Sequence, residues 1–352
     1  MSNWYTSREA VKRAGKINGV LSDVQIDRII ESVSRQLDLS TRRFFLPRTE
    51  TRLYRWPPTQ TSLLTVLWLD QDLLSVTTLK SEAQNTSPTT ISSSDFFLEP
   101  NNQGPPYDRI EIDLSSTAAY QSGDTPQRSI SVEGSWGYTS NTRSGGTVAS
   151  GLDSDATATT MVCSNASRIG VGDTLLIQSE QVFVSERDFA ALDSKLTDGV
   201  LTANQSEVTV TVDSSHGIVA GEVIRVESEQ MYVVAVATND LTVIRAYNGS
   251  VLAAHSNNTA VHINRTLTIE RGVNGTTAAT HADATSITPY EPPLDIQSLC
   301  IGETLAMFAQ EEAQWGRAVG PGDASRDFTT LDLAARKHRT VEYYSRVRMA
   351  VV

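Results

Sequence analysis

The 352-residue sequence contains only two cysteines, Cys163 and Cys300, which excludes a disulfide scaffold and a zinc ribbon. No apolar run approaches the roughly 20 residues that a membrane-spanning helix needs, so we expect no membrane partner. Basic residues are outnumbered by acidic ones, 29 to 41, and this excess argues against a protein whose main task is to hold nucleic-acid phosphates. The first residues contain no apolar signal segment, so we expect synthesis in the cytoplasm.

Motifs of common enzyme chemistry are missing as well. The sequence has no Gly-x-x-x-x-Gly-Lys-Ser/Thr phosphate loop, no Gly-x-Ser-x-Gly nucleophile turn and no His-x-x-x-His pair. Asp70 and Asp72 resemble a metal-binding pair, but a turn between two strands explains them better. Cys163 and Cys300 have no evident basic neighbour, which favours packed thiols over nucleophiles. We therefore predict that the protein is not an enzyme and that it uses no cofactor and no metal.

The charge is distributed unevenly along the chain. Residues 1–60 carry 11 basic and 6 acidic side chains, whereas residues 145–290 carry 7 and 16. Such asymmetry is typical of a chain whose segments meet different partners. A helix with Lys and Arg on its solvated face explains the basic end equally well.

Both ends of the chain have helical patterns. Thr6–Glu9 and Ser22–Gln25 have the form of capping boxes, and the first helix should end at Gly15. The second helix carries one apolar stripe: Ile26, Ile29, Ile30, Val33 and Leu37. Near the other end, 294–315 is apolar on more than one face, which predicts a buried helix.

The C-terminal end continues with a joint and a last helix. Gly316–Gly322 is typical of a flexible joint, and Thr329–Asp332 should begin the final helix. Arg346 and Arg348 follow at its end, where the helix dipole favours cations.

Between the ends, β-branched and aromatic residues alternate between turn signals. The predicted strands are Leu63–Leu69, Leu73–Leu79, Phe96–Leu98, Arg109–Leu114 and Ser129–Trp136. Glycines near residue 145 and prolines at 289–293 are typical of boundaries around a separate region.

The middle region contains a repeat. Residues 172–184 recur at 221–233, and Leu241–Arg245 with its Asn-Gly turn recurs at Leu267–Arg271. The order is first half, first half, second half, second half, which indicates one β unit inserted into a hairpin of another. We therefore predict an α+β protein with three domains: residues 1–144 with 291–352, an outer β unit of 145–199 with 264–290, and an inner β unit of 200–263. The terminal parts would be helical around a small antiparallel sheet, and each inserted unit would be a small barrel or sandwich.

The repeats place polar residues at equivalent positions. His255 and His281 invite a ligand hypothesis, but their recurrence favours a structural role such as hydrogen bonding to a turn. Glu180 and Glu229 are a possible carboxylate pair for acid–base work, although solvent-facing or turn-satisfying roles explain them better.

Aromatic residues are a further candidate for binding. They could form stacking platforms for sugar or single-stranded nucleic acid. Trp68 and Trp136 lie in predicted strands, however, where packing in a core or interface is the usual role. The excess of acidic residues also argues against binding of nucleic acid. The candidates are Trp56, Trp68, Trp136, Trp315, Tyr343 and Tyr344.

Without the inserted region, the chain resembles a known family. The resemblance rests on the Arg-Phe motif of Arg42–Pro47 after the second helix, and on Pro292–Ile296, with its Pro-x-x-Ile, before the closing helices. Between them it rests on three sheet segments: Phe96–Pro100, Pro106–Ile112 and Ile130–Tyr138, the last with the pattern Val-x-Gly-x-x-Gly-Tyr. This order is similar to that of the head–tail connector, or adaptor, proteins of tailed bacteriophages. The large nested β insert is a departure that the resemblance does not explain.

The resemblance implies a structural virion protein that is made in the host cytoplasm and located in the neck. Copies would form a ring, typically of twelve, between the portal protein and tail or nozzle proteins, possibly with fibres, and DNA would pass through the lumen without specific binding. Arg42, Arg43 and Phe44 would hold neighbouring subunits together. The residues expected to dock on the portal are Arg336, Lys337, Arg339, Arg346 and Arg348.

Two other functions stay open at this stage. The nested β units could bind a host surface or a glycan, in which case residues 150–290 alone would bind polysaccharide. A cell-wall hydrolase that uses Glu180 and Glu229 is the third reading.

Overall fold

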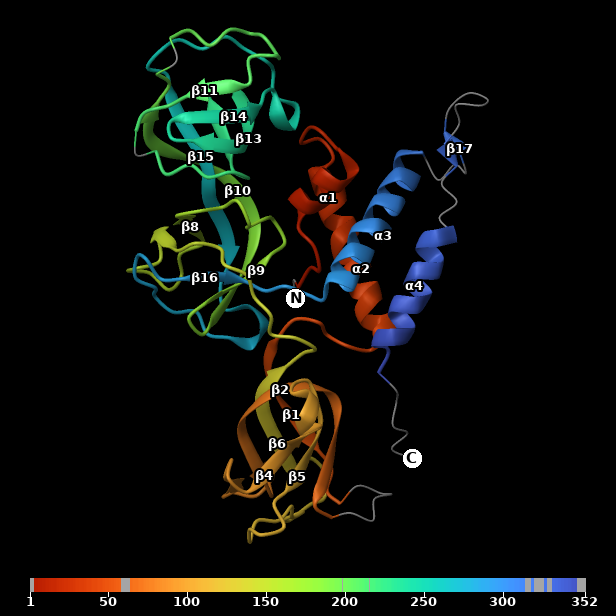
Figure 1. Cartoon of the computed structure of the whole chain (residues 1–352). Helices are drawn as coiled ribbons and strands as arrows, with labels where there is room; N and C mark the ends of the chain where they lie inside the picture. The colour runs from red at the N-terminus through yellow and green to blue at the C-terminus, as the bar shows by residue number, and fades with distance from the viewer. Residues whose placement is uncertain are drawn as a thin grey trace.

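The computed structural model describes residues 3–57, 64–197, 199–214, 216–313, 318–319, 326–327 and 331–346. It consists of a layer of helices, a small sheet at one end of the molecule, and a long β region with two lobes beside the helices (Figure 1). The helices come from the two ends of the chain, and the strands of the small sheet and of the β region come from its middle. The predicted α+β class with an inserted β region is confirmed.

The helix layer joins both ends of the chain. The helices are α1 (Arg8–Gly15), α2 (Asp23–Thr41), α3 (Leu294–Glu312) and α4 (Leu331–Tyr344). Both α2 and α3 contact every other helix of this layer. The predicted stripe of α2 is fully buried, and each such side chain stabilises the layer by about 1.5–3 kcal/mol.

The predicted capping boxes are wrong, although α1 ends at Gly15 as expected. Ser7 caps α1 by accepting a hydrogen bond from the N–H of Ala10. Glu9 instead accepts a hydrogen bond of 2.8 Å from the N–H of Val171, in the β region. Ser22 makes no side-chain cap bond. Glu9 therefore attaches the first helix to the β region, a tertiary contact that replaces the local one.

The prediction that the long C-terminal helix is buried is also wrong. In α3 one narrow strip is buried, including Ile296, Leu299 and Cys300, whereas Leu294 is exposed and most other positions are half-buried. Of the expected joint at Gly316–Gly322, only β17 (Ala318–Val319) is described, and it pairs with β18 (Arg326–Asp327). Trp315 and the expected cap at 329–330 lie outside the described residues.

The small sheet is antiparallel and has a hydrophobic core of its own around Leu73, Ile110 and Trp136. Its strands have the order β1-β6-β2-β5-β4, with β3 on β2, and a 3-10 turn (Asn101–Gln103) follows β4. The strands are β1 (Arg48–Tyr54), β2 (Val66–Ser81), β3 (Thr89–Ile91), β4 (Phe96–Glu99), β5 (Tyr107–Ile112) and β6 (Ile130–Trp136).

The turn expected at Asp70–Asp72 does not exist. Strand β2 continues from Val66 to Ser81, pairing mainly with β5 in its first half and with β6 in its second. The register against β5 shifts between Trp68 and Leu73, so the acidic residues lie where the strand changes partner. Sequence alternation could not distinguish this exchange from a turn.

The β region is one antiparallel sheet with the order β11-β14-β13-β12-β15-β10-β9-β16, to which β8 and β7 are added beside β15. Its strands are β7 (Val148–Ser150), β8 (Thr160–Cys163), β9 (Thr174–Ile177), β10 (Glu180–Lys195), β11 (Thr209–Thr211), β12 (Val223–Val226), β13 (Glu229–Ala237), β14 (Asp240–Ile244), β15 (Ala260–Glu270) and β16 (Ile287–Pro289). Two 3-10 turns, η2 (Tyr247–Gly249) and η3 (Val273–Gly275), contain the repeated Asn-Gly pairs.

The long strands β10 and β15 run through both lobes (Figure 1). They pair from Phe183 opposite Glu270 to Lys195 opposite Ala260. One hydrophobic cluster includes Val184 and lies in the lobe with β9, and a second includes Ile263 and lies in the lobe with β12 to β14. The lobes therefore have separate cores but share one hydrogen-bonded sheet.

Candidate functional site

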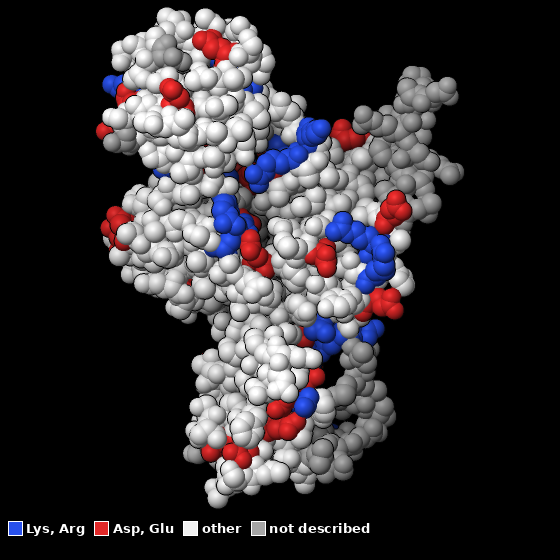
Figure 2. Space-filling model, in the orientation of Figure 1, with Lys and Arg blue, Asp and Glu red and all other residues white. Residues whose placement is uncertain are grey.

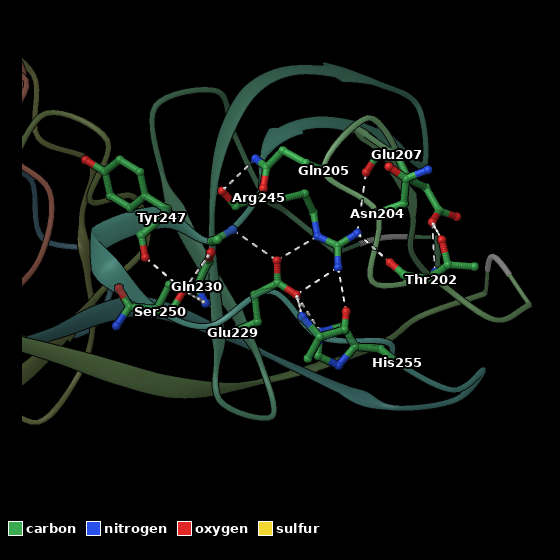
Figure 3. Close-up of polar contacts among 12 residues, drawn as sticks. Thr202, Asn204, Gln205, Glu207, Glu229, Gln230, Arg245, Tyr247, Ser250 and His255 are labelled. Atoms are coloured by element: carbon green, nitrogen blue, oxygen red, sulfur yellow. Dashed lines mark hydrogen bonds and ion pairs between the residues drawn. The ribbon is translucent and has the colours of Figure 1, made fainter.

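The strongest polar cluster of the inner lobe surrounds Glu229, which is fully buried at the start of β13. Arg245 donates two hydrogen bonds to its carboxylate, of 2.7 and 2.8 Å, and His255 Nε2 lies 2.9 Å from it (Figure 3). The backbone N–H groups of Ala246 and Ala253 donate at 3.0 and 3.1 Å. The carboxylate thus connects β13 to the end of β14 and to the loop after η2.

The outer lobe contains the same cluster around Glu180, at the start of β10. Arg271 donates at 2.7 and 2.8 Å, and His281 Nε2 lies 2.8 Å from the carboxylate. The N–H groups of Gly272 and Ala279 each donate at 3.0 Å. The sequence repeat is therefore a repeat of one ion-pair cluster.

The chemistry of both clusters is structural. Burial alone would raise the pKa of Glu180 and Glu229, but hydrogen bonds from arginine, histidine and backbone N–H groups outweigh it and lower each pKa to about 2. A solvent-facing position for these residues, as one reading expected, is wrong, because both are fully buried. The turn-satisfying role expected for the glutamates is confirmed by their hydrogen bonds to backbone N–H groups. His255 and His281 are structural as expected, but they bind these carboxylates and not the turn backbone.

Each lobe has a second buried carboxylate, which the sequence reading missed. Glu222 accepts hydrogen bonds of 2.7 and 2.8 Å from Arg265, and at the equivalent position Asp173 accepts one of 2.7 Å from Arg143. Both acids follow a glycine of the repeat, and this Gly-acid pair was the available signal. The arginines could not be identified, because Arg143 lies outside the repeated segments.

The equivalent turns η2 and η3 both contact the N-terminal part of the chain. The side chain of Asn248 in η2 accepts a hydrogen bond of 2.7 Å from Lys12 in α1. Asn274 in η3 donates one of 2.7 Å to the side chain of Asn3. A Cβ on Gly275 would lie 2.0 Å from the carbonyl oxygen of Thr49, so η3 approaches β1 as closely as glycine allows. Both lobes are fixed to the helix layer and small sheet in this way.

The residues expected to dock on a portal have unequal surroundings. Arg336 and Arg339 are exposed on α4. Lys337 is half-buried and binds Glu303 of α3 at 2.7 Å. Arg346 binds Asp72 at 2.6 Å and the carbonyl oxygen of Leu69 at 2.7 Å, both in the small sheet. Arg348 lies outside the described residues.

Arg42, Arg43 and Phe44, expected between subunits, have contacts within the chain. Arg43 binds Asp72 at 2.5 Å and lies over the ring of Tyr138 at 5.3 Å. The ring of Phe44 lies 3.8 Å below the guanidinium of Arg48. Arg42 is exposed at the end of α2, in the left-handed conformation with φ of 57°.

The remaining polar candidates have simple explanations. Burial raises the thiol pKa of Cys163 to about 11 and of Cys300 to about 12, so both are packed thiols. Asp70 accepts hydrogen bonds from Arg52 at 2.8 Å and from Tyr54 at 2.7 Å. Across the described ranges, no group of three or more His, Cys, Asp or Glu side chains could hold a metal ion. The helices described are all too short or too polar to cross a membrane.

Most candidate aromatic residues are packed in the core. Trp56, Trp136 and Tyr344 are buried, and Trp136 donates a hydrogen bond of 3.0 Å to the carbonyl oxygen of Glu50. Trp68 is partly exposed and lies under Arg109 at 5.1 Å, whereas Tyr343 is 77% exposed. These positions do not form one stacking platform.

Comparisons with models of protein families, with curated proteins and with solved structures find no match to this chain. The functional reading therefore depends on the residues and contacts of the chain itself.

Proposed function

We propose that the chain is a non-enzymatic structural protein of a tailed-bacteriophage virion, a head-to-tail adaptor that forms a ring in the neck. The observation that supports this proposal is the meeting of three of the segments that carry the family resemblance: Arg42–Pro47, Ile130–Tyr138 and Pro292–Ile296. They are far apart in sequence, yet all three contribute to the junction between the helix layer and the small sheet.

At this junction the backbone segments touch directly. The N–H of Tyr138 donates a hydrogen bond of 2.8 Å to the carbonyl oxygen of Phe44. A Cβ on Gly137 would lie 2.7 Å from the carbonyl oxygen of Leu46, so this contact requires glycine or a shift of the chain. The third segment contributes Ile296, which belongs to the same hydrophobic cluster as Leu46. The short motifs thus specify one tertiary contact, which is a reason to regard them as a unit.

The junction also holds α4 in position. Asp72 of β2 binds Arg43 from one side and Arg346 from the other, and the rings of Tyr138 and Tyr344 meet edge to face at 5.3 Å. Charge-assisted hydrogen bonds of this kind are among the stronger polar contacts in proteins. A helix held so firmly suits a part that transmits load between head and tail.

The internal contacts narrow the expected portal-docking set. Arg346 and Lys337 already bind acids of the same chain, so among the described members of the set we propose Arg336 and Arg339 for the portal. Arg348, outside the described residues, stays in the proposed set. Arg43 binds Asp72 of the same chain. Of the three residues proposed to hold neighbouring subunits together, Arg42 is therefore the one that is exposed.

Glycan binding by the β units, the alternative function, receives less support. Aromatic rings offer the amphipathic surfaces on which ligands such as sugars stack. Among the described residues of 145–290, the large hydrophobic side chains that are exposed are aliphatic. We therefore propose that the β lobes contact other virion proteins, such as tail, nozzle or fibre proteins.

The hydrolase reading is weaker still. Glu180 and Glu229 belong to separate clusters, have no solvent exposure and have depressed pKa values of about 2. A general acid that works near neutral pH needs a raised pKa and access to its substrate.

The decisive experiment is a cryo-EM reconstruction of the neck of the source particle, averaged about the tail axis. The proposal expects a ring of this chain directly under the portal, with α4 against it and the β lobes outside. Location of the chain at the tail tip or in the fibres would contradict it.

A binding assay tests the docking residues separately. Arg336→Glu with Arg339→Glu should abolish capture of the chain by purified portal. Arg55→Glu, at an exposed arginine directly after β1, is the control and should bind normally. Normal capture of the double variant would remove these residues from the proposal.

A further inference from the structure

A cavity of about 290 Å³ lies where α1, both β lobes and the start of α3 meet. Figure 2 shows basic side chains on both sides of the hollow between α1 and the β region. Four arginines and three acids line the cavity, in a chain whose net charge is −12. Its local charge is thus opposite to that of the whole molecule.

The acids of the cavity already have hydrogen-bond or ion-pair partners within the chain. Asp173 accepts hydrogen bonds from Arg143 at 2.7 Å and from the N–H of Gly170 at 2.9 Å. Glu291 lies 3.5 Å from the same arginine. Glu9 accepts a hydrogen bond from backbone N–H of the outer lobe. One arginine, Arg143, therefore serves two of the three acids.

The other three arginines retain unused donors. Arg187 donates hydrogen bonds from its terminal nitrogens to the carbonyl oxygens of Ile169 and Asn264, at 2.6 and 2.8 Å, and forms an ion pair of 3.9 Å with Glu9. Its Nε is buried and has no hydrogen-bond partner. Carbonyl oxygens satisfy hydrogen bonds but carry no full charge, so the long contact with Glu9 is the one ion pair that compensates this guanidinium among the described residues.

The cavity mouth adds two more cations and a pair of tyrosines. Arg168 is exposed, and its guanidinium makes no hydrogen bond or ion pair with the described residues. Arg13 donates only its Nε, to a carbonyl oxygen at 3.3 Å. The rings of Tyr232 and Tyr247 pack at 5.3 Å and form one wall. Burial raises the pKa of Tyr247, with Arg13 opposing it, so its hydroxyl is a hydrogen-bond donor at neutral pH.

We propose that this cavity binds a compact oxyanion, either free phosphate or an acidic side chain of another protein, held by Arg168, Arg13, Arg187 and Tyr247. Guanidinium groups match the paired oxygens of phosphate and carboxylate. The volume is at the lower end of the roughly 300–1,000 Å³ found for small-molecule sites, which suits one such group and not a nucleotide. The proposal is independent of the adaptor function.

Titration calorimetry of the full chain at constant ionic strength tests this site, with inorganic phosphate and an octaglutamate peptide as probes. Binding of phosphate identifies the free ion as ligand, and binding of the peptide alone identifies an acidic side chain; either result supports the site. Arg168→Ala should weaken binding about tenfold, the usual effect of one charge-assisted hydrogen bond. Tyr247→Phe, which keeps the ring, should weaken it several-fold.

Two control variants make the test specific. Arg55→Ala removes the same charge far from the cavity, and Tyr343→Phe removes a hydroxyl from an exposed ring of α4. Both should bind as the unaltered chain does. Absence of binding by both probes up to about 10 mM, an affinity too weak to indicate a built site, would overturn the proposal. Equal weakening by Arg55→Ala and Arg168→Ala would also overturn it, because the effect would then reflect net charge alone.

Discussion

The two equivalent ion-pair clusters allow a test in which each lobe serves as the control for the other. Arg245→Met removes the cation from Glu229 in the inner lobe and keeps most of the side-chain volume. Arg271→Met makes the same change at Glu180 in the outer lobe. Because the partners and distances match, the two variants should have equal effects in different places.

The expected magnitude follows from the burial of the carboxylate. Glu229 loses two of its five hydrogen bonds and its neutralising charge, while burial prevents water from replacing them. Breaking a buried ion pair by removing one partner costs about 3–5 kcal/mol. The double variant Glu229→Gln with Arg245→Met should lose less, since no unpaired charge remains buried.

Hydrogen exchange followed by mass spectrometry measures the effect separately in each lobe. With Arg245→Met, amides of β12 and β14 should exchange about two to four orders of magnitude faster, which corresponds to the expected loss of local stability. Amides of β9 should be nearly unchanged. Arg271→Met should give the reverse pattern.

Two results would refute the reasoning. An increase of less than about fivefold in either lobe, roughly 1 kcal/mol, would mean that the arginine does not stabilise the buried carboxylate. A double variant less stable than Arg245→Met alone would mean that packing, and not charge, dominates the cluster.

Three further predictions concern the same framework. The pKa values of Glu180 and Glu229 are lowered from 4.5 to about 2, so the stability that these carboxylates contribute is complete above about pH 5 and is lost as the pH falls toward 2. The melting temperature should therefore decrease between about pH 5 and pH 2, and a constant melting temperature over that range would contradict this. Asp72→Ala should remove the carboxylate partner of Arg43 and Arg346 and make the backbone amides of α4 exchange hydrogen at least about tenfold faster. An unchanged exchange rate in α4 would show that Asp72 does not hold this helix in position. Gly275→Ala should lower the free energy of unfolding, measured with urea, by about 3 kcal/mol because the added methyl group clashes with β1. Gly199→Ala, with open space around it, should lower it by about 1 kcal/mol, and equal losses in the two variants would exclude the close approach of η3 to β1.

Local pattern was sufficient for several features of the fold. The stripe of α2 could be predicted because helical spacing alone places its five apolar residues on one face. The clusters around Glu180 and Glu229 were visible as equivalent positions, since a repeat in sequence gives a repeat in structure. Their burial was not visible, because a glutamate in an alternating strand looks the same whether it faces water or an arginine.

Features that depend on distant partners could not be read from the chain. Strand β2 changes its pairing partner from β5 to β6 at Asp70–Asp72. In the sequence alone, these polar residues between two apolar stretches look like a turn. Glu9 had a local capping role available but binds Val171 of the β region. The cavity arginines come from α1 and from the chain before and after the repeated segment 172–184. No short stretch of sequence therefore contains the whole site.

The sequence by itself determined the helical ends, the β middle, the repeat and the scarcity of recognisable catalytic motifs, since each depends on neighbours within a few tens of residues. The tertiary structure alone decided which charges are paired, which cations stay exposed and where four arginines gather around one cavity. The physical reason is that burial and electrostatic pairing depend on distances in space, and folding brings together residues as far apart as Asp72 and Arg346.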